Sequence, residues 1–332
     1  CSNNFKQIGL GIHNYHSAFK QLPTNMTGTD RPQHLGNSNN LLGYNANRRY
    51  LSYLVPLLPY VEQQGLWEQV SNPSLQVNPE NASMPGNVQN GIWPAMGPAP
   101  WRAQYVPWAT EVPTFRCPSD PASAIGTALG RTNYAASLGD SFDYAWWGGK
   151  NEAGFFNNGN QIPRDMFDEN WMVTRAKAAN RGFFWPRSDS KFRDVLDGLS
   201  NTVAAGEIVT SKGAREVKAD YVRRITAMTP TNSHFATPSF CKNGPHIDPE
   251  RPAFYTRAAT VNGGTNNGRG ARWADGRPAY AAFQTILPPN SPSCARNNSD
   301  NTYSIFSAGS RHQGGAHVLM GDGAVIFMTD SV

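Results

Sequence analysis

The first twenty residues constrain the fold most strongly, because their apolar side chains recur with the period of an α-helix. These side chains are three or four residues apart and fall on one helical face: Phe5, Ile8, Ile12, Tyr15 and Phe19. Pro23 ends the pattern, since proline forces the residue before it out of the α region. Gly9 and Gly11 each cost this helix about 1 kcal/mol relative to alanine, so it needs tertiary packing or an upstream continuation. We therefore predict a spine helix over residues 1–22 on which a sheet is laid, although an ordinary amphipathic core helix has the same periodicity.

The strongest strand signal lies at the opposite end of the chain. Two apolar runs, residues 317–320 and 324–328, flank the turn sequence Gly-Asp-Gly and predict a β-hairpin within residues 301–332. Shorter segments with strand character and one short helix precede it: strands at 112–117, 132–137, 182–184 and 202–206, and a helix at about 59–70. One long helix followed by short strands and hairpin turns indicates an α+β fold, with the helix packed on an antiparallel sheet.

Long polar stretches separate these elements and predict large loop-rich insertions within a single domain, residues 1–332. The aromatic content of 11% and the low net charge of +5 exclude a disordered chain. Residues 24–110 form a predicted loop-rich region, and residues 111–211 hold most of the strand signals. Residues 212–300 contain two cysteines and the glycine-rich segment VNGGTNNGRG, so we expect an insertion there. The longest apolar run is only a few residues, so no transmembrane segment is expected, and the abrupt start at Cys1 suggests a processed or trimmed product.

Charge and cysteine usage narrow the possible partners and the compartment. Lysine and arginine are scattered, and no basic run is interleaved with aromatic residues, so a nucleic-acid partner is not expected. None of the four cysteines forms a C-x-x-C pair, which argues against a zinc ribbon or a thioredoxin-type site. An even number favours two disulfides in an oxidising compartment. We favour Cys241–Cys294, which would staple the insertion, and Cys1–Cys117, which would tie the helix to the body; four free buried thiols are the alternative.

Three blocks of sequence stand out: CSNNFKQIGLGIHNYH at the start, FRCPSDP with TNYA and DGLSNTVAAGE in the middle, and ILPPNSPSC with SRHQGGAHVLMGDG at the end. Together they resemble a bacterial family of prepilin-like proteins related to the major pseudopilins of type II secretion. Members carry a prepilin-type cleavage and methylation segment and a His-x9-Asp-Gly motif, which here is His312, Asp322 and Gly323. The blocks span nearly the whole chain in the family's order.

The resemblance implies a pilin-like fold and an exported structural or interaction protein of a secretion or surface-filament system. It implies a hydrophobic helix before Cys1 that anchors the protein in the inner membrane before assembly. The implied location is the periplasm or the cell surface, and the implied partners are other pilin-like subunits or secretion machinery. It implies no reaction, and we predict no catalytic residue. His312 and Asp322 could act as base and orienter, but no nucleophile motif accompanies them. We expect instead that Gly323 permits a turn, Asp322 bonds its own turn and His312 caps or bonds a neighbouring loop.

Two metals can be considered from residue types alone. His13 and His16 are three residues apart and could share a helical face for zinc, but no third ligand lies nearby in sequence. Calcium fits the oxygen-rich loops better, and pseudopilins are known for calcium in C-terminal loops. The loop carboxylates Asp275, Asp300 and Asp322 are the candidate ligands, although no EF-hand spacing is present.

Tryptophan-rich loops give the main alternative function, an extracellular glycan-binding protein or glycoside hydrolase. The side chains that could stack on sugar rings are Trp93, Trp101, Trp108, Trp146 and Trp147. A hydrolase would also need paired carboxylates, for which Asp140 with Asp143, or Asp165 with Asp168 and Glu169, are available. The competing interpretation makes these aromatic residues the private cores of long loops. A third hypothesis, a periplasmic solute-binding protein, would require a hinged two-lobe shape.

Overall fold

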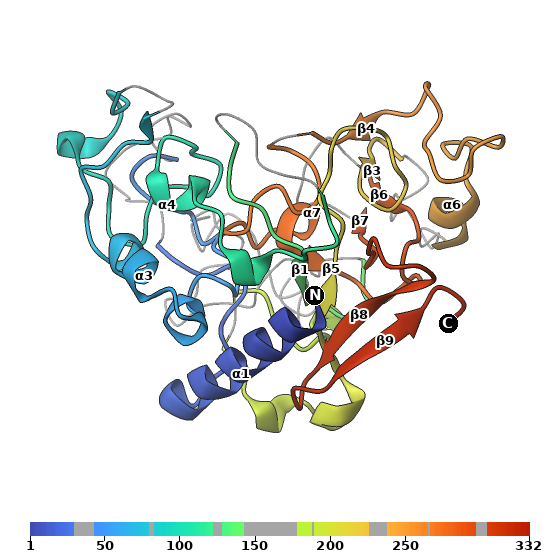
Figure 1. The fold of residues 1–332 in the computed structure, drawn as a ribbon, viewed down its shortest axis with the longest axis horizontal. Coiled ribbons are helices and arrows are strands. Elements are labelled where there is room, and N and C mark those ends of the chain that lie inside the picture. Colours follow the sequence, from blue (N-terminus) through green and yellow to red (C-terminus); the bar gives the residue numbers. More distant parts are fainter. Residues whose placement is uncertain are drawn as a thin grey trace, which may run out of the picture.

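A long N-terminal helix lies against a five-stranded sheet, and a second sheet of four short strands completes the fold (Figure 1). The structure is a computed structural model, and it describes residues 1–29, 43–79, 83–121, 128–142, 178–187, 189–225, 238–264, 266–296 and 304–332. The fold class is therefore mixed α+β, as predicted.

Helix α1, Ser2–Phe19, is the predicted spine helix. It buries Phe5, Ile8 and Ile12 and ends at Lys20, whose backbone is left-handed and donates its N–H to His16 O. Phe19 was expected on the buried face but is exposed. It lies beyond the last buried turn and packs on Tyr15, with ring centroids 4.6 Å apart.

The two helix glycines allow α1 to approach its neighbours closely. A Cβ atom on Gly9 would stand 3.0 Å from Leu319 Cδ1 of strand β8, Gly315–Met320. A Cβ atom on Gly11 would stand 3.4 Å from Val61 Cγ1 in the 3-10 helix η2, Leu58–Val61. Tertiary packing thus offsets the poor helix propensity of glycine, which is one of the two ways in which we expected this helix to be stabilised.

The five-stranded sheet has the order β5-β1-β2-β8-β9. Its strands are β1 (Tyr134–Ser137), β2 (Val203–Glu207), β5 (Ala282–Phe283), β8 and β9 (Val325–Thr329). The predicted C-terminal hairpin is present as β8–β9 and lies beside α1 in Figure 1. The sheet is not purely antiparallel, because β5 pairs parallel to β1.

The second sheet is built mainly from residues 212–300, which were expected to be an insertion. Its order is β4-β3-β6-β7, with β3 (Tyr221–Val222), β4 (Val261–Asn262), β6 (Ser293–Ala295) and β7 (Ser304–Ile305). Three of these strands and β5 come from residues 212–300, as do α6 (Pro238–Asn243) and α7 (Pro278–Ala281). Strands of two residues carry almost no periodic signal, which is why the sequence did not reveal them.

Several short elements differ from the sequence prediction. The expected strand at 112–117 is a 3-10 turn, η5 (Pro113–Phe115), because Pro113 fixes its own φ and has no N–H for a strand ladder. The expected strand at 182–184 is a bend, where the Gly182 backbone packs against Gly139. The expected helix at 59–70 divides into η2 and α3 (Gln64–Ser71), because Glu62 has a left-handed backbone.

The loop-rich region also supplies much of the main hydrophobic core. It contains the short elements η4 (Gln89–Gly91) and α4 (Val106–Ala109), and η6 (Phe192–Asp194) and η7 (Leu199–Asn201) follow later in the chain. Its buried side chains join α1 and the first sheet in one cluster and include Leu51, Tyr53, Leu54, Trp93, Tyr105 and Trp108. Residues with little regular structure therefore pack in the same core as α1 and the first sheet and help to hold the two together.

Candidate functional site beside the Cys1–Cys117 disulfide

Two disulfides fix the ends of key elements. Cys1, at the start of α1, is bonded to Cys117, which follows η5, and Cys241 in α6 is bonded to Cys294 in β6. All four cysteines are therefore paired, in the pairs that the sequence analysis favoured.

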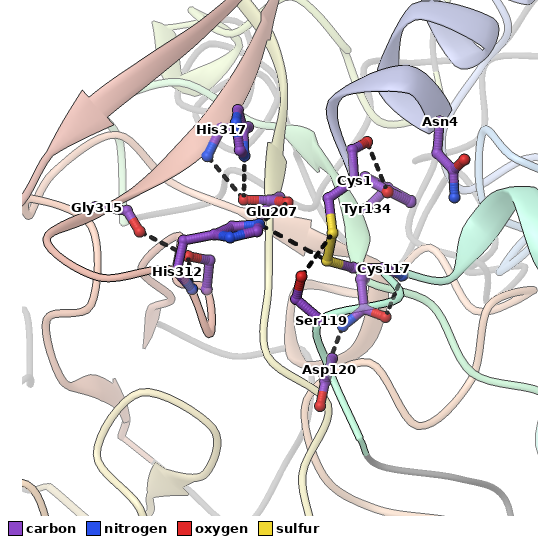
Figure 2. Close-up of polar contacts among 12 residues, drawn as sticks. Cys1, Asn4, Cys117, Ser119, Asp120, Tyr134, Glu207, His312, Gly315 and His317 are labelled. Atoms are coloured by element: carbon purple, nitrogen blue, oxygen red, sulfur yellow. Dashed lines mark hydrogen bonds and ion pairs between the residues drawn. A yellow bond between two sulfur atoms is a disulfide. The ribbon is translucent and has the colours of Figure 1, made fainter.

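A buried glutamate lies next to the first disulfide (Figure 2). Glu207 is the last residue of β2, and its side chain is 1% exposed. Its Oε2 atom accepts the backbone N–H of His317 at 2.8 Å and lies 3.1 Å from His317 Nδ1. Its Oε1 atom lies 3.4 Å from His312 Nε2 and has no hydrogen-bond partner within the described part of the chain.

His312 reaches the same point from the loop before β8. Its Nε2 atom is 3.8 Å from Cys117 Sγ, and its ring meets the His317 ring edge-on at 4.8 Å. Ser310 holds this loop, because its hydroxyl accepts the His312 backbone N–H at 3.0 Å and donates to Gly315 O at 2.6 Å. His312 thus lies against the end of β2 and the Cys1–Cys117 disulfide.

The other two motif residues lie at the far end of β8. Asp322 Oδ1 accepts the backbone N–H of Ala324 at 2.9 Å, and Gly323 has φ +91°, so both have the predicted turn roles. His13 of α1 lies against this turn, with Nε2 3.1 Å from Gly321 O. The motif therefore spans β8 and places one contact near each end of that strand, rather than forming a His–Asp catalytic pair.

Hydrogen bonds hold both cysteine backbones independently of the S–S bond. Tyr134 donates its hydroxyl to Cys1 O at 3.0 Å. The Cys117 backbone N–H donates to Asn133 Oδ1 at 2.9 Å, and Asn133 in turn donates to the buried Asp120 at 2.6 Å. The site is thus built on β1 and β2, the centre of the first sheet.

Sequence reasoning missed Glu207 and His317. The available signal for Glu207 was a lone carboxylate that ends the apolar segment VAAGE directly after a predicted strand. His317 was seen only as part of an apolar strand, and its role depends on the register that pairs β8 with β2.

The two predicted calcium ligands that lie within the described residues have other partners. Asp275 is buried and bound by Arg272 and Arg277, Asp322 bonds its own turn, and Asp300 lies outside the described residues. Across the described ranges, the group of metal-binding side chains that converges consists of Cys1, Cys117, Glu207 and His312, with one ligand atom from each within 4.8 Å of the others. Neither His13 nor His16 belongs to it.

Two of the tryptophans proposed for glycan stacking are buried, so that part of the alternative is wrong. Trp93 and Trp108 donate their indole N–H groups to Gln76 O and Pro98 O, inside the main core. A ring buried on both faces cannot stack on a sugar, and the loop-core interpretation applies to both. Trp101 is half-buried beside the Arg277 guanidinium.

Among the carboxylates of the glycan alternative, Asp140 lies within the described residues. Asp140 forms an exposed ion pair with Arg181. The remaining candidates lie outside the described residues: Asp143, Trp146, Trp147, Asp165, Asp168 and Glu169.

The fold and site define an α+β protein whose N-terminal helix packs on a sheet and is bonded by a disulfide to the segment after η5. The chain belongs to the family SBP_bac_10, described as "Protein of unknown function (DUF1559)", whose model matches residues 1–332. No curated protein and no solved structure matches the chain. Among the described helices, none has the length and apolar character needed to cross a membrane.

Proposed function

We propose that this protein is an exported pilin-like structural or interaction protein of a secretion or surface-filament system, with α1 as its spine. The observation that carries the proposal is the two-sided character of α1. One side is covered by β8, β9, η2 and η5. The other side is open and exposes Leu10 (62%) among polar residues, whereas Phe19 (57%) lies on the packed face but beyond the last buried turn. Leu10 on the outward face, and Phe19 at the end of the helix, are exposed apolar side chains that suit contact with a neighbouring subunit.

The attachment of α1 supports the same proposal. The Cys1–Cys117 disulfide joins the first turn of α1 to the body, and the close approach at Gly9 joins its middle to β8. Force on a segment upstream of Cys1 would therefore pass to the sheet and not unwind the helix. Two disulfides also suit an oxidising compartment such as the periplasm or the cell surface.

The proposed partners are other pilin-like subunits or secretion machinery, and the inner membrane through a hydrophobic helix upstream of Cys1. The native N-terminus tests this directly, by mass spectrometry of the protein taken from its own cell. An N-methylated residue that heads a hydrophobic segment is the expected result. A signal-peptidase cut close to Cys1 would contradict the proposal.

The outward face of α1 can be tested with a photo-crosslinking residue. Benzoylphenylalanine in place of Leu10 should give crosslinks between copies of this chain or to a pilin-like partner. Leu75 provides the matched control, because it is also an exposed leucine (72%) but lies after α3, outside α1. Equal crosslinking from both positions would argue against α1 as the assembly surface.

A further inference from the structure

Four side chains of the kinds that bind transition metals converge at the start of α1. They are the two disulfide-bonded cysteines, Cys1 and Cys117, together with His312 and Glu207 (Figure 2). We propose that this cluster binds one Zn²⁺ ion when the disulfide is reduced, through both sulfurs, His312 Nε2 and Glu207 Oε1. The start of the spine helix would then be held to the segment after η5 by a disulfide in the oxidised protein, and to that segment, β2 and the loop before β8 by zinc in the reduced protein.

The distances from His312 Nε2 to Glu207 and Cys117 match those between two ligands of one zinc ion better than the length of a direct hydrogen bond. Tetrahedral zinc with ordinary bond lengths separates a nitrogen from an oxygen ligand by about 3.4 Å and a nitrogen from a sulfur ligand by about 3.6 Å. His312 Nε2 lies 3.4 Å from Glu207 Oε1 and 3.8 Å from Cys117 Sγ. An N–H···O bond is shorter, at about 2.9 Å.

The buried carboxylate gives an independent reason for a cation here. Glu207 is almost fully buried, and burial of a carboxylate is costly unless its oxygens have partners. Oε2 is satisfied by His317, whereas Oε1 faces the cysteine sulfurs and His312 without a hydrogen bond from the described residues. His317 thereby fixes the carboxylate as an outer-shell partner does in metal sites.

The site is largely formed before any metal binds. The hydrogen bonds from Tyr134 to Cys1 and from Cys117 to Asn133 do not depend on the S–S bond. Both sulfurs should therefore stay near His312 and Glu207 after reduction. Two thiolates, an imidazole and a carboxylate form a ligand set for zinc and not for calcium, which prefers oxygen ligands alone.

The second disulfide, Cys241–Cys294, provides an internal control for the proposed zinc site. Cys294 Sγ also lies 3.8 Å from a histidine nitrogen, Nε2 of His246. His246, however, is bonded to Cys241 O at 2.9 Å, and this pair does not belong to the converging donor group. We therefore expect no zinc site at Cys241–Cys294.

The redox step balances with a phosphine reductant. The phosphorus gives two electrons to the S–S bond, which breaks, and water supplies the oxygen of the phosphine oxide and one proton to each sulfur. Zinc then displaces those two protons from the thiols. In the reverse direction a small-molecule disulfide accepts the two electrons, the protein disulfide forms, and zinc is released.

The experiment measures zinc alone against the full chain, by native mass spectrometry and by competition with a chromophoric chelator. We expect one zinc per chain in the reduced protein and none in the oxidised protein. His312→Ala should abolish the complex, and His317→Ala should weaken it about 10- to 100-fold as an outer-shell loss. The double variant Cys241→Ser/Cys294→Ser, after reduction, should still bind one zinc.

A second variant covers the case in which reduction of both disulfides unfolds the protein. Cys1→Ser cannot form the first disulfide but keeps Cys241–Cys294, Cys117, His312 and Glu207, so it should bind zinc without any reductant, more weakly than the reduced wild type. Absence of a one-to-one zinc complex from both proteins overturns the proposal. Equal zinc binding by the oxidised wild type, or by His312→Ala, overturns it as well.

Discussion

The buried ion pair of Asp275 makes the sharpest stability prediction. Its carboxylate is completely buried and accepts from Arg277 at 2.9 and 2.6 Å and from Arg272 at 3.2 Å. Both arginines are themselves buried. Asp275→Asn keeps the shape but removes the charge, which leaves two buried guanidinium groups with a neutral partner. Loss of one partner of a buried ion pair costs about 3–5 kcal/mol in free energy of unfolding.

The matched control is Asp140→Asn. Asp140 pairs with Arg181 at a similar distance, 2.8 Å, but both side chains are more than half exposed. A surface ion pair of this kind contributes at most about 1 kcal/mol.

Thermal unfolding separates the two variants. The unfolding entropy of a chain of this length is about 0.7 kcal/mol per kelvin, so Asp275→Asn should lower Tm by about 4–7 °C. Asp140→Asn should change it by less than about 2 °C. Salt should weaken only the exposed pair, because buried charges are poorly screened. Equal Tm values for the two variants would refute the reasoning from burial.

Three further outcomes follow from the packing and the titratable groups. Gly11→Ala should stabilise the protein by about 0.5–1 kcal/mol, whereas Gly9→Ala should lose that gain because its Cβ would press on Leu319 at 3.0 Å. Guanidinium unfolding of both variants measures the difference in stability. Equal stabilisation by the two substitutions would contradict the close contact at Gly9. Burial lowers the pKa of His246, so the stability that it contributes is present above its ordinary pKa and is lost as the pH falls through its folded pKa. The guanidinium unfolding midpoint of the wild type should therefore fall more steeply with pH below about pH 6.5 than that of His246→Gln. Parallel plots of midpoint against pH for the two proteins would count against a lowered pKa of His246. EDTA should leave the Tm of the oxidised protein unchanged, since the Asp275 carboxylate is paired with two arginines and not with a metal ion. A Tm drop that added calcium reverses would restore the calcium hypothesis.

The helix, the hairpin and the disulfide pairs could be predicted from sequence because their signals are local or few. Phe5, Ile8 and Ile12 recur with the helical period, and the Gly-Asp-Gly turn separates two apolar runs that pair directly. Four cysteines allow only three pairings, so a simple argument about which elements need fastening reached the observed pairs.

The second sheet and the parallel β1–β5 pair could not be predicted in the same way. Their strands are two to four residues long, and their partners lie far away in the chain. Pairing over such distances depends on which loops fold over the core. The burial of Trp93 and Trp108, which removes them from any glycan site, has the same origin.

The sequence by itself determined the amphipathic spine helix, the terminal hairpin and the turn roles of Asp322 and Gly323, because each depends on neighbours within a few residues. Only the tertiary structure decided what His312 contacts. The register of β2 with β8 carries Glu207 beneath His317, and the folding of α1 onto the sheet brings Cys1 and Cys117 to the same point. A site assembled from four separated segments has no local pattern, since its chemistry exists only after long-range packing has fixed the distances.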